Sequence, residues 1–306
     1  MFHDMIDAVL SQRLDGTVEV LVADSGSTDG TREAALARGA RLIDVPPEEF
    51  SHGGTRNLLM EQSTGEYVAF LTADAVPADE SWLAELLAGF DDAPDVGLVY
   101  GPYVPRRDAS PMVRRELTEF FAGMSPDGRP RVDRGLPAEA RRPGPVTFYT
   151  DANGCIARRA WERVPYRPVT YAEDQLLALD MLAAGFAKVF RPRAAVLHSH
   201  DYPPFERFGR FFDEFRALRE VYGHVEEVGL RHTLGTARRA VIRDREFMRR
   251  EGATGRDVRR ATLDSALFHG LRAAGAALGS RSDRIPAPLR RVLSREGRAS
   301  FDPIEP

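Results

Sequence analysis

The sequence contains a single cysteine and a single lysine, and it has no long apolar run. Because Cys155 stands alone, no disulfide can form within the chain, which is compatible with a reducing compartment. No stretch approaches the roughly 20 consecutive apolar residues needed to cross a bilayer. The opening MFHDMIDAVLSQ is amphipathic and acidic, unlike a secretion signal, which is basic and then apolar. We therefore expect a cytoplasmic protein that is neither exported nor membrane-spanning.

The charge of the chain is distributed unevenly. The net charge is -4, yet residues 225–306 hold 17 arginines against 11 acidic residues. Such a basic excess is typical of contact with an anionic membrane surface or an acidic partner. A solvated face of arginine-rich helices is the favoured explanation, because arginine replaces lysine throughout the chain. We expect no nucleic-acid partner.

Short β-rich runs alternate with amphipathic helical stretches over the first two thirds of the chain, a pattern typical of a mostly parallel α/β sheet. We expect strands at 18–23, 41–44, 67–71, 96–100 and 155–157, and helices at 31–38, 55–62, 81–90 and 173–184. Asp29 and Asp79 are expected as helix N-caps. Residues 125–145, rich in Pro, Gly and Arg, are expected to form a long loop. From residue 205 the pattern is helical, so we predict an α/β domain over 1–224 and a helical appendage over 225–306.

The chain opens on a predicted helix, residues 2–12, where a parallel α/β domain normally begins with a strand. Loss of an interior strand would leave backbone groups of the sheet unpaired. We therefore expect the native gene product to begin upstream of Met1, which mass spectrometry of the native N-terminus would test.

The segment VLVADSGSTDGT, residues 20–31, delivers Asp24 from an apolar strand into a Gly/Ser turn that opens a helix. A carboxylate at the carboxyl end of a strand can accept hydrogen bonds from a base or ribose, and a helix N-terminus favours anions. The alternative is a capped strand-to-helix turn without a ligand.

Two further segments carry charged residues next to the predicted strands. In FSHGGTRN, residues 50–57, Arg56 at the start of a helix has the fork geometry that suits a diphosphate, with His52 nearby. The alternative is a salt bridge to a carboxylate at the sheet end. Asp74 follows the strand at 67–71, and a lone aspartate in that position is by itself more typical of a helix cap or turn residue.

Two candidate groups lie in the second half of the α/β region. In TYAEDQLLALDMLAAGF, residues 170–186, Glu173 and Asp174 stand in the first turn of a helix, where the dipole stabilises carboxylates. Simple capping is the alternative. In VLHSHDY, residues 196–202, His198 and His200 share one face of an extended chain, a spacing that permits metal coordination but also occurs in surface or capping residues.

Together these segments resemble the family 2 glycosyltransferases, enzymes of GT-A fold, over residues up to about 205. The segment FSHGGTRN is similar to a sequence segment found in bacterial rhamnosyltransferase-like members of this family. The resemblance implies that Asp174 is the catalytic base and that Mg2+ or Mn2+ is bound by Asp74 and His198, in preference to His200. Thr72 departs from the family's Asp-x-Asp metal motif. The implied nucleotide-sugar site comprises Asp24, Ser25, Gly26, Ser27, Asp29, Arg56 and Asp74, and the implied acceptor side comprises Asn153, Gly154 and Glu173.

The resemblance implies an inverting transfer of a sugar from a nucleoside diphosphate sugar, with dTDP-rhamnose as the suggested donor, to a glycan or lipid-linked acceptor hydroxyl. The product would serve cell-surface or polysaccharide glycan synthesis. A catalytically impaired nucleotide- or glycan-binding module is an alternative, suggested by the absent strand and Thr72. A sugar nucleotidyltransferase is another, but no glycine-rich, lysine-containing phosphate loop lies near the start. The helical tail is expected to contact a membrane peripherally, the catalytic domain or a second subunit.

Overall fold

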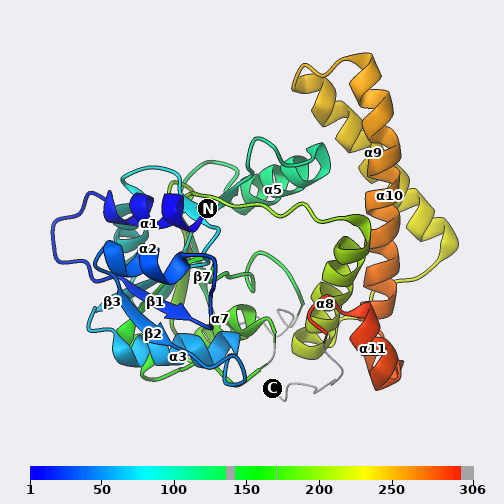
Figure 1. The fold of residues 1–306 in the computed structure, drawn as a ribbon. Helices are drawn as coiled ribbons and strands as arrows, with labels where there is room; N and C mark the ends of the chain where they lie inside the picture. Colours follow the sequence, from blue (N-terminus) through cyan, green and yellow to red (C-terminus); the bar gives the residue numbers. More distant parts are fainter. Residues whose placement is uncertain (136–141, 170, 298–306) are drawn as a thin grey trace. The chain divides into compact units, whose positions relative to one another are not determined.

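The structure is a computed structural model that describes residues 1–135, 142–169 and 171–297 (Figure 1). The chain forms two compact units, one of Met1–Val104 with Phe120–His198 and one of Pro105–Glu119 with Ser199–Pro306. These limits differ from those of the predicted domains, 1–224 and 225–306. A functional division at residue 224 stays a prediction. Residues 136–141 of the expected loop, residue 170 of the TYAEDQ segment and residues 298–306 of the appendage lie outside the described part.

Within the described residues, the first unit contains three sheets and the helices that connect their strands. The strands are β1 (Leu21–Asp24), β2 (Arg41–Asp44), β3 (Tyr67–Leu71), β4 (Val76–Pro77), β5 (Val96–Tyr100), β6 (Tyr103–Val104), β7 (Arg131–Arg134), β8 (Asn153–Ala157), β9 (Ala187–Phe190) and β10 (Val196–Leu197). The helices are α1 (Phe2–Leu10), α2 (Thr31–Ala37), α3 (His52–Gln62), α4 (Trp82–Ala88), the 3-10 turn Gly89–Asp91, α6 (Arg158–Trp161) and α7 (Glu173–Ala183). Helix α5 (Pro111–Met124) begins in the second unit and ends in the first.

The largest sheet has the strand order β3-β8-β5-β9-β7. Strand β9 runs parallel to β5, whereas β8 is antiparallel to both β3 and β5, and β7 is antiparallel to β9. Strands β1 and β2 form a separate parallel pair, and β4, β10 and β6 form a small third sheet. The predicted α/β class is confirmed, but in the largest sheet only β5 and β9 pair in parallel, so this sheet is mixed rather than mostly parallel.

The core of this unit lies on β5, β8 and β9, whose residues are all buried. Lys188 of β9 is also fully buried, and its ammonium pairs with the Asp133 carboxylate at 2.9 Å. The ammonium lies 4.7 Å from the centre of the Tyr100 ring. Burial lowers the pKa of Lys188 to about 8, although the Asp133 charge opposes this shift. The only lysine of the chain therefore serves as a buried partner for a carboxylate.

Several element boundaries differ from the prediction for local reasons. Helix α3 begins three residues earlier than expected, because Ser51 caps it by accepting a hydrogen bond from the Gly54 N–H at 3.2 Å. The expected N-caps Asp29 and Asp79 are wrong, since Gly30 and Ser81 occupy those positions. Each aspartate instead accepts a hydrogen bond from the backbone N–H two residues further on.

Other boundaries also depend on contacts outside the local sequence. Strand β1 covers only the second half of the predicted 18–23, and α1 ends at Leu10 rather than at residue 12. The expected loop at 125–145 contains β7, which is held by pairing with β9, including Val132 with Val189. The four residues of β7, RVDR, include two arginines and an aspartate, so their local sequence does not predict a strand.

The second unit consists of helices α8 (Pro204–Tyr222), α9 (Leu230–Arg250), α10 (Gly255–Gly279) and α11 (Ala287–Leu293), with a 3-10 turn at Ser282–Arg284 and the first part of α5. None of the helices in the described part of the chain combines the length and apolarity that a membrane crossing requires. Helix α8 packs along α10, where Gly275 and Gly279 leave room for the α8 backbone at Phe212.

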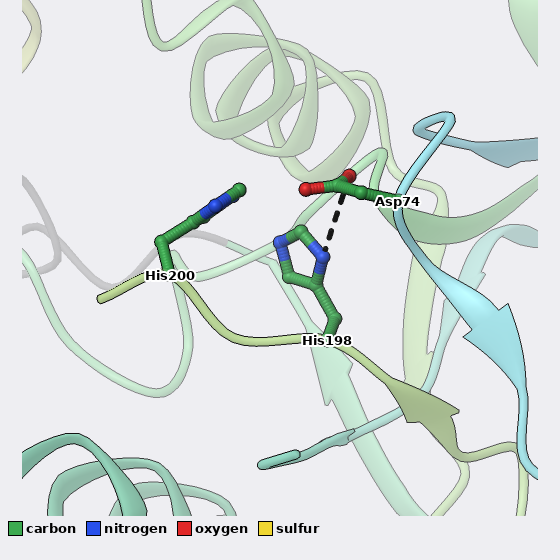
Figure 2. Close-up of side chains that lie close together, drawn as sticks. All are labelled: Asp74, His198 and His200. Carbon is green, nitrogen blue, oxygen red and sulfur yellow. Dashed lines mark ion pairs between the residues drawn. The ribbon is translucent and has the colours of Figure 1, made fainter. Parts of the chain in front are cut away.

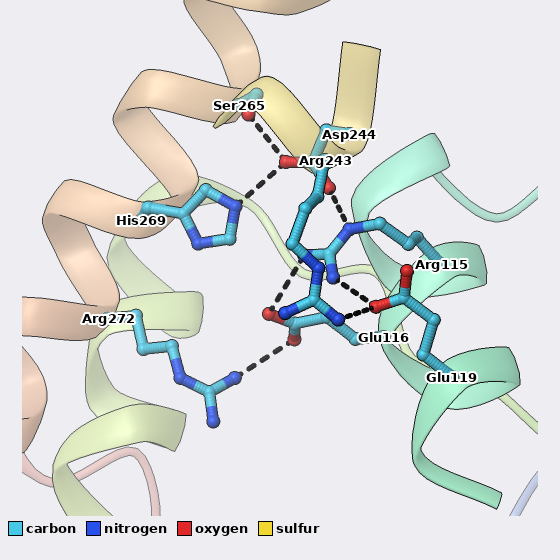
Figure 3. A network of polar contacts seen from close by, with 8 residues as sticks. All are labelled: Arg115, Glu116, Glu119, Arg243, Asp244, Ser265, His269 and Arg272. Carbon is cyan, nitrogen blue, oxygen red and sulfur yellow. Dashed lines mark hydrogen bonds and ion pairs between the residues drawn. The ribbon is translucent and has the colours of Figure 1, made fainter. Parts of the chain in front are cut away.

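A buried polar network joins α5, α9 and α10 within this unit (Figure 3). The Asp244 carboxylate accepts hydrogen bonds from Ser265 at 2.6 Å and from His269 at 2.8 Å, and it pairs with Arg115. Burial opposes ionisation of Asp244, but these hydrogen bonds outweigh burial and lower its pKa. Because Asp244 is bonded to groups on two other helices, the network fixes how the three helices pack.

Candidate functional site

The predicted site residues follow strands that end at one edge of the first unit. The starts of β1 and β3 lie together, since the Glu19 carboxylate before β1 accepts a hydrogen bond from the Gly65 N–H at 3.1 Å. At the other edge, Leu71 ends β3 opposite Asn153, which begins the antiparallel strand β8. Arg56, in the first turns of the helix after β2, reaches Asp151 just before β8. The carboxyl ends of β2 and β3 therefore meet at this edge, and β1 ends there too because it is parallel to β2.

Asp24 closes the turn after β1. Its buried carboxylate accepts hydrogen bonds from the backbone N–H groups of Gly26 and Ser27, both at 3.1 Å, and from Arg32 at 2.7 Å. Burial opposes the charge, but these hydrogen bonds prevail and lower the pKa of Asp24 below its ordinary value. Gly26 and Gly30 have φ of 87° and 88°, which a residue with a side chain adopts at a cost. The turn thus holds an ionised carboxylate beside the start of α2.

Arg56 lies in a buried cluster of acids at the same edge. Its Nε lies 3.0 Å from Asp151 Oδ2, and its Nη1 lies 2.6 Å from Glu173 Oε1. Tyr166 donates a hydrogen bond to the other oxygen of Asp151 at 2.7 Å. This arrangement is the sheet-end salt bridge that the sequence left as an alternative, and a contact of Arg56 with a diphosphate stays a prediction.

Asp174 adds a third carboxyl group to this cluster. Burial, followed by repulsion from Glu173 and Asp151, raises the pKa of Asp174 well above its ordinary value, although Arg56 acts in the opposite direction. Burial likewise raises the pKa of Asp151 to about 6. One guanidinium therefore faces three carboxyl groups, and the excess negative charge favours proton uptake by the cluster.

The backbone before Asp174 is strained. Ala172, the N-cap residue just before α7, has φ of 57° and ψ of 31°, a left-handed conformation that is rare for a residue with a Cβ. Such strain costs about 1–3 kcal/mol and gathers at functional sites, where the surrounding structure holds it. It places Glu173 and Asp174 at the helix start, the position that the sequence predicted for them.

A candidate metal site lies after β3 and β10 (Figure 2). His198 Nδ1 lies 3.5 Å from Asp74 Oδ1, and the His198 ring is buried against Tyr103, with 4.7 Å between ring centres. His200 follows two residues later, and one ligand atom from each of Asp74, His198 and His200 lies within 4.8 Å of the other two. The sequence-predicted metal residues thus come together, with His200 included.

Asn153 and Gly154, predicted on the acceptor side, are buried within β8. The Asn153 side chain accepts a hydrogen bond from Trp82 at 2.8 Å and donates one to the Ala194 carbonyl at 2.8 Å. A Cβ on Gly154 would lie 2.3 Å from the Tyr149 hydroxyl, so only glycine fits there. Both residues have a clear packing role in the sheet, and their acceptor role stays a prediction.

Sequence reasoning missed Asp151 and Arg32. Asp151 lies just before β8, and its role depends on Arg56, which is 95 positions away in the sequence, and on Tyr166. Arg32 bridges Asp24 and Asp44 at the ends of β1 and β2, at 2.7 and 2.5 Å. Its position in the first turn of the helix that follows a strand-ending aspartate was the available signal.

Comparisons with known proteins identify the family of the chain and support its fold. The family model described as glycosyl transferase family 2 matches residues 1–161. The chain is 32% identical over 199 residues to the O-antigen chain rhamnosyltransferase WbaN of Salmonella anatum, which covers 64% of this chain and 61% of that protein. It is 29% identical over 218 residues to the O-antigen chain rhamnosyltransferase RfbN of Salmonella typhimurium, covering 70% of this chain and 67% of that protein.

Among solved structures, the chain resembles the mannosyltransferase PcManGT from Pyrobaculum calidifontis, determined in complex with GDP-Man and Mn2+. The TM-score is 0.55 at 17% identity, covering 93% of this chain and 84% of the other. This likeness supports the predicted GT-A type of α/β fold. Because the family model spans more than half of the chain, the protein belongs to glycosyl transferase family 2.

Proposed function

We propose that the protein transfers a sugar from a nucleoside diphosphate sugar to an acceptor hydroxyl, with inversion at the anomeric carbon. The observation that carries the proposal is Asp174 at the strained start of α7, at the sheet edge where family membership leads us to expect the reaction. Membership in this family disfavours both a non-catalytic binding module and a sugar nucleotidyltransferase.

Asp174 is the proposed general base. A carboxyl group whose pKa is raised by burial and neighbouring acids is a stronger base than an ordinary aspartate. It would take the proton from the acceptor hydroxyl while that oxygen attacks the anomeric carbon opposite the leaving diphosphate. Arg56 holds Glu173 and Asp151 in place beside it, and so fixes the local charge that sets its proton affinity.

The turn after β1 is the proposed nucleotide site. Asp24 is held ionised at the strand end, ready to accept hydrogen bonds from the base or ribose. Ser25, Gly26, Ser27 and Asp29 would shape this turn around the nucleotide.

The candidate metal group fits a divalent ion. Asp74, His198 and His200 offer one carboxylate oxygen and two imidazole nitrogens as ligands. Mg2+ prefers oxygen ligands, whereas imidazole is common among ligands of later divalent ions, so this set suits Mn2+ better than Mg2+. When bound, such an ion neutralises the charge that grows on the departing diphosphate.

The names of the relatives support a proposal for the donor and the acceptor. Two of them are named O-antigen chain rhamnosyltransferases, so we propose a rhamnosyl donor such as dTDP-rhamnose and a glycan or lipid-linked acceptor. The arginine-rich α9 exposes Leu234 and Ile242, which suits peripheral contact with an anionic membrane from the cytoplasmic side. Vesicle flotation at low and high salt tests that contact, and absence of binding to anionic vesicles at low salt would remove it.

A donor panel tests the proposed function. Purified protein is incubated with nucleotide sugars, Mn2+ and acceptor, and the product's anomeric configuration is read by NMR. An inverted glycoside with release of nucleoside diphosphate is expected, and loss of this product in Asp174→Asn with retained nucleotide binding would support the base. Pyrophosphate release from a nucleoside triphosphate would instead indicate a nucleotidyltransferase, and binding without any turnover would indicate a binding module.

A further inference from the structure

The second unit contains a cavity of its own, beside the segment that carries His200. The cavity has a volume of about 430 Å³, within the roughly 300–1,000 Å³ that is usual for ligand pockets. It lies where α5 and α8 begin and is bordered by one face of α10. Its lining comprises residues 110–112, 201–204 and 207, with Ala261, Asp264 and Leu267, and we call it the helix-start pocket. All of these residues belong to the second unit, so the pocket is complete within that unit.

Arg207 lines this pocket with part of its hydrogen-bonding capacity unused. Its side chain is 14% exposed, its Nη2 donates to Asp201 at 2.8 Å, and its guanidinium lies 5.1 Å from the centre of the Phe268 ring. Asp201 also accepts a hydrogen bond from the Ser110 N–H at 2.7 Å. These contacts hold the guanidinium in place, whereas its Nε and Nη1 have no hydrogen-bond partner among the residues that the structure describes. A fixed guanidinium with free N–H groups is ready to donate to oxygen atoms of a ligand.

Helix α10 supplies a hydrogen-bond acceptor. Asp264 lies between Ala261 and Leu267, each three positions away, so the three side chains share one face of the helix. The Asp264 carboxylate makes no ion pair or hydrogen bond within the described part of the chain. The Ser110 hydroxyl is buried and likewise has no hydrogen-bond partner among the described residues, which is uncommon unless water or a ligand completes it. The pocket therefore offers donors and acceptors that the protein itself does not use.

The charges of the pocket favour a neutral polar ligand. The lining holds one guanidinium, that of Arg207, and two carboxylates, those of Asp201 and Asp264, so it disfavours a phosphate or carboxylate ligand. The starts of α5 and α8 add partial positive charge, so neither sign dominates. A sugar residue suits this lining, because its hydroxyls donate to carboxylates and accept from a guanidinium. Its C–H groups can pack on apolar side chains such as Met112 and Leu267.

We propose that the helix-start pocket binds one neutral sugar residue of the glycan acceptor, other than the residue that receives the transferred sugar. Asp201 follows His200 directly, and the Tyr202 ring, which lines the pocket, stacks with the His200 ring at 5.3 Å between ring centres. The pocket thus lies next to a member of the candidate metal group. That the sugar belongs to an acceptor rests on the proposed function. A second contact of this kind strengthens the binding of an extended glycan over that of a single sugar.

Binding of simple sugars tests the pocket without donor or metal ion. Saturation-transfer NMR titrations measure the affinity of methyl glycosides of glucose, galactose, mannose and rhamnose for the wild type and for Ala261→Trp, whose indole would fill the cavity. Ala266→Trp is the matched control, because Ala266 is exposed on the same helix and does not line the pocket. We expect at least one glycoside to bind the wild type and Ala266→Trp equally, and to bind Ala261→Trp more weakly by about tenfold or more.

Asp264→Ala keeps the test decisive if Ala261→Trp does not fold. Asp264 is exposed and has no partner among the described residues, so its loss should leave the fold intact and weaken binding of the same glycoside by about tenfold. Absence of glycoside binding to the wild type, or equal binding to the wild type and Asp264→Ala, would overturn the proposal. Inorganic phosphate that binds more tightly than every glycoside, and loses affinity in Ala261→Trp, would show an anion site and would also overturn it.

Transfer assays separate this proposal from the proposed function. With an acceptor of three sugar residues, Asp264→Ala should raise KM by about tenfold and leave kcat unchanged, whereas with a single-sugar acceptor both constants should match those of the wild type. Glycoside binding that depends on the pocket, without any sugar transfer, would support the pocket and contradict the proposed function. Sugar transfer with equal KM for the three-residue acceptor in the wild type and Asp264→Ala would refute the acceptor role of the pocket.

Discussion

Replacing Arg56 by methionine should destabilise the first unit strongly and in a pH-dependent way. The guanidinium pairs with Asp151 at 3.0 Å and with Glu173 at 2.6 Å, and the three side chains are 14%, 1% and 8% exposed. Removing one partner of a buried ion pair costs about 3–5 kcal/mol, because the remaining charge stays buried without compensation. Here two carboxylates lose their cation, and Asp174 lies in the same cluster.

The sign of the pH dependence follows from the carboxyl groups. The pKa of Asp151 is already raised to about 6, and loss of the Arg56 charge would raise it further. A folded-state pKa above the unfolded value means that the folded protein binds the proton more tightly, so stability falls as pH rises through that window. The stability deficit of Arg56→Met should therefore be largest near pH 8 and smaller near pH 5.

Urea denaturation followed by circular dichroism at pH 5 and pH 8 measures both effects. Arg56→Lys keeps a positive charge but lacks the forked guanidinium that binds two carboxylates. Its free energy of unfolding should therefore lie between those of the wild type and Arg56→Met. Arg13→Met is the matched surface control, because the Arg13 side chain is 81% exposed and its pair with Glu80 should be worth about 1 kcal/mol or less. The prediction is contradicted if Arg56→Met lowers the free energy of unfolding at pH 8 by no more than Arg13→Met does. It is also contradicted if the loss of stability is equal at pH 5 and pH 8.

Four further outcomes are expected. Asp174→Asn should lower turnover by about 10²–10⁴-fold without loss of nucleotide affinity by calorimetry, as expected for removal of a general base; full turnover would reject the role. Asp24→Asn should weaken nucleotide binding by about tenfold or more, because a hydrogen bond to a charged acceptor is worth about 1.5–3 kcal/mol, and equal affinity would contradict the site. His198→Ala should weaken Mn2+ binding in a titration, whereas the exposed His3 replaced by alanine should not. Asp244→Asn should lower the melting temperature, since Arg115 would lose its buried carboxylate partner and keep only the more exposed Glu116 and Glu119; an unchanged midpoint would show that the Asp244 charge contributes little to the network of Figure 3.

The sequence predicted the features that depend on neighbouring residues. The turn at Asp24 is formed by amides two and three residues away, and DSGST signals it directly. The helix start at Glu173 and Asp174 follows from acidic residues ahead of an apolar helical pattern. Two histidines spaced by two residues after a strand permitted a metal site without identifying one, and it was the family resemblance that added Asp74 and favoured His198.

Features that join distant segments were not predictable in the same way. Arg56 and Glu173 are 117 positions apart, and Arg115 and Asp244 are 129 positions apart. The local sequence around each residue does not predict its partner, because a buried ion pair forms only when the helices and strands that carry its two residues pack together. The same reason explains β7, which is a strand only because β9 lies beside it.

The burial of Lys188 has a practical consequence for following unfolding. An endoproteinase that cuts only after lysine has one target bond in the whole chain, and it lies inside β9 between β5 and β7. A protease can reach that bond only when the central sheet opens. Cleavage there gives two fragments of predictable mass, so their amount would report the population of the opened first unit without any label.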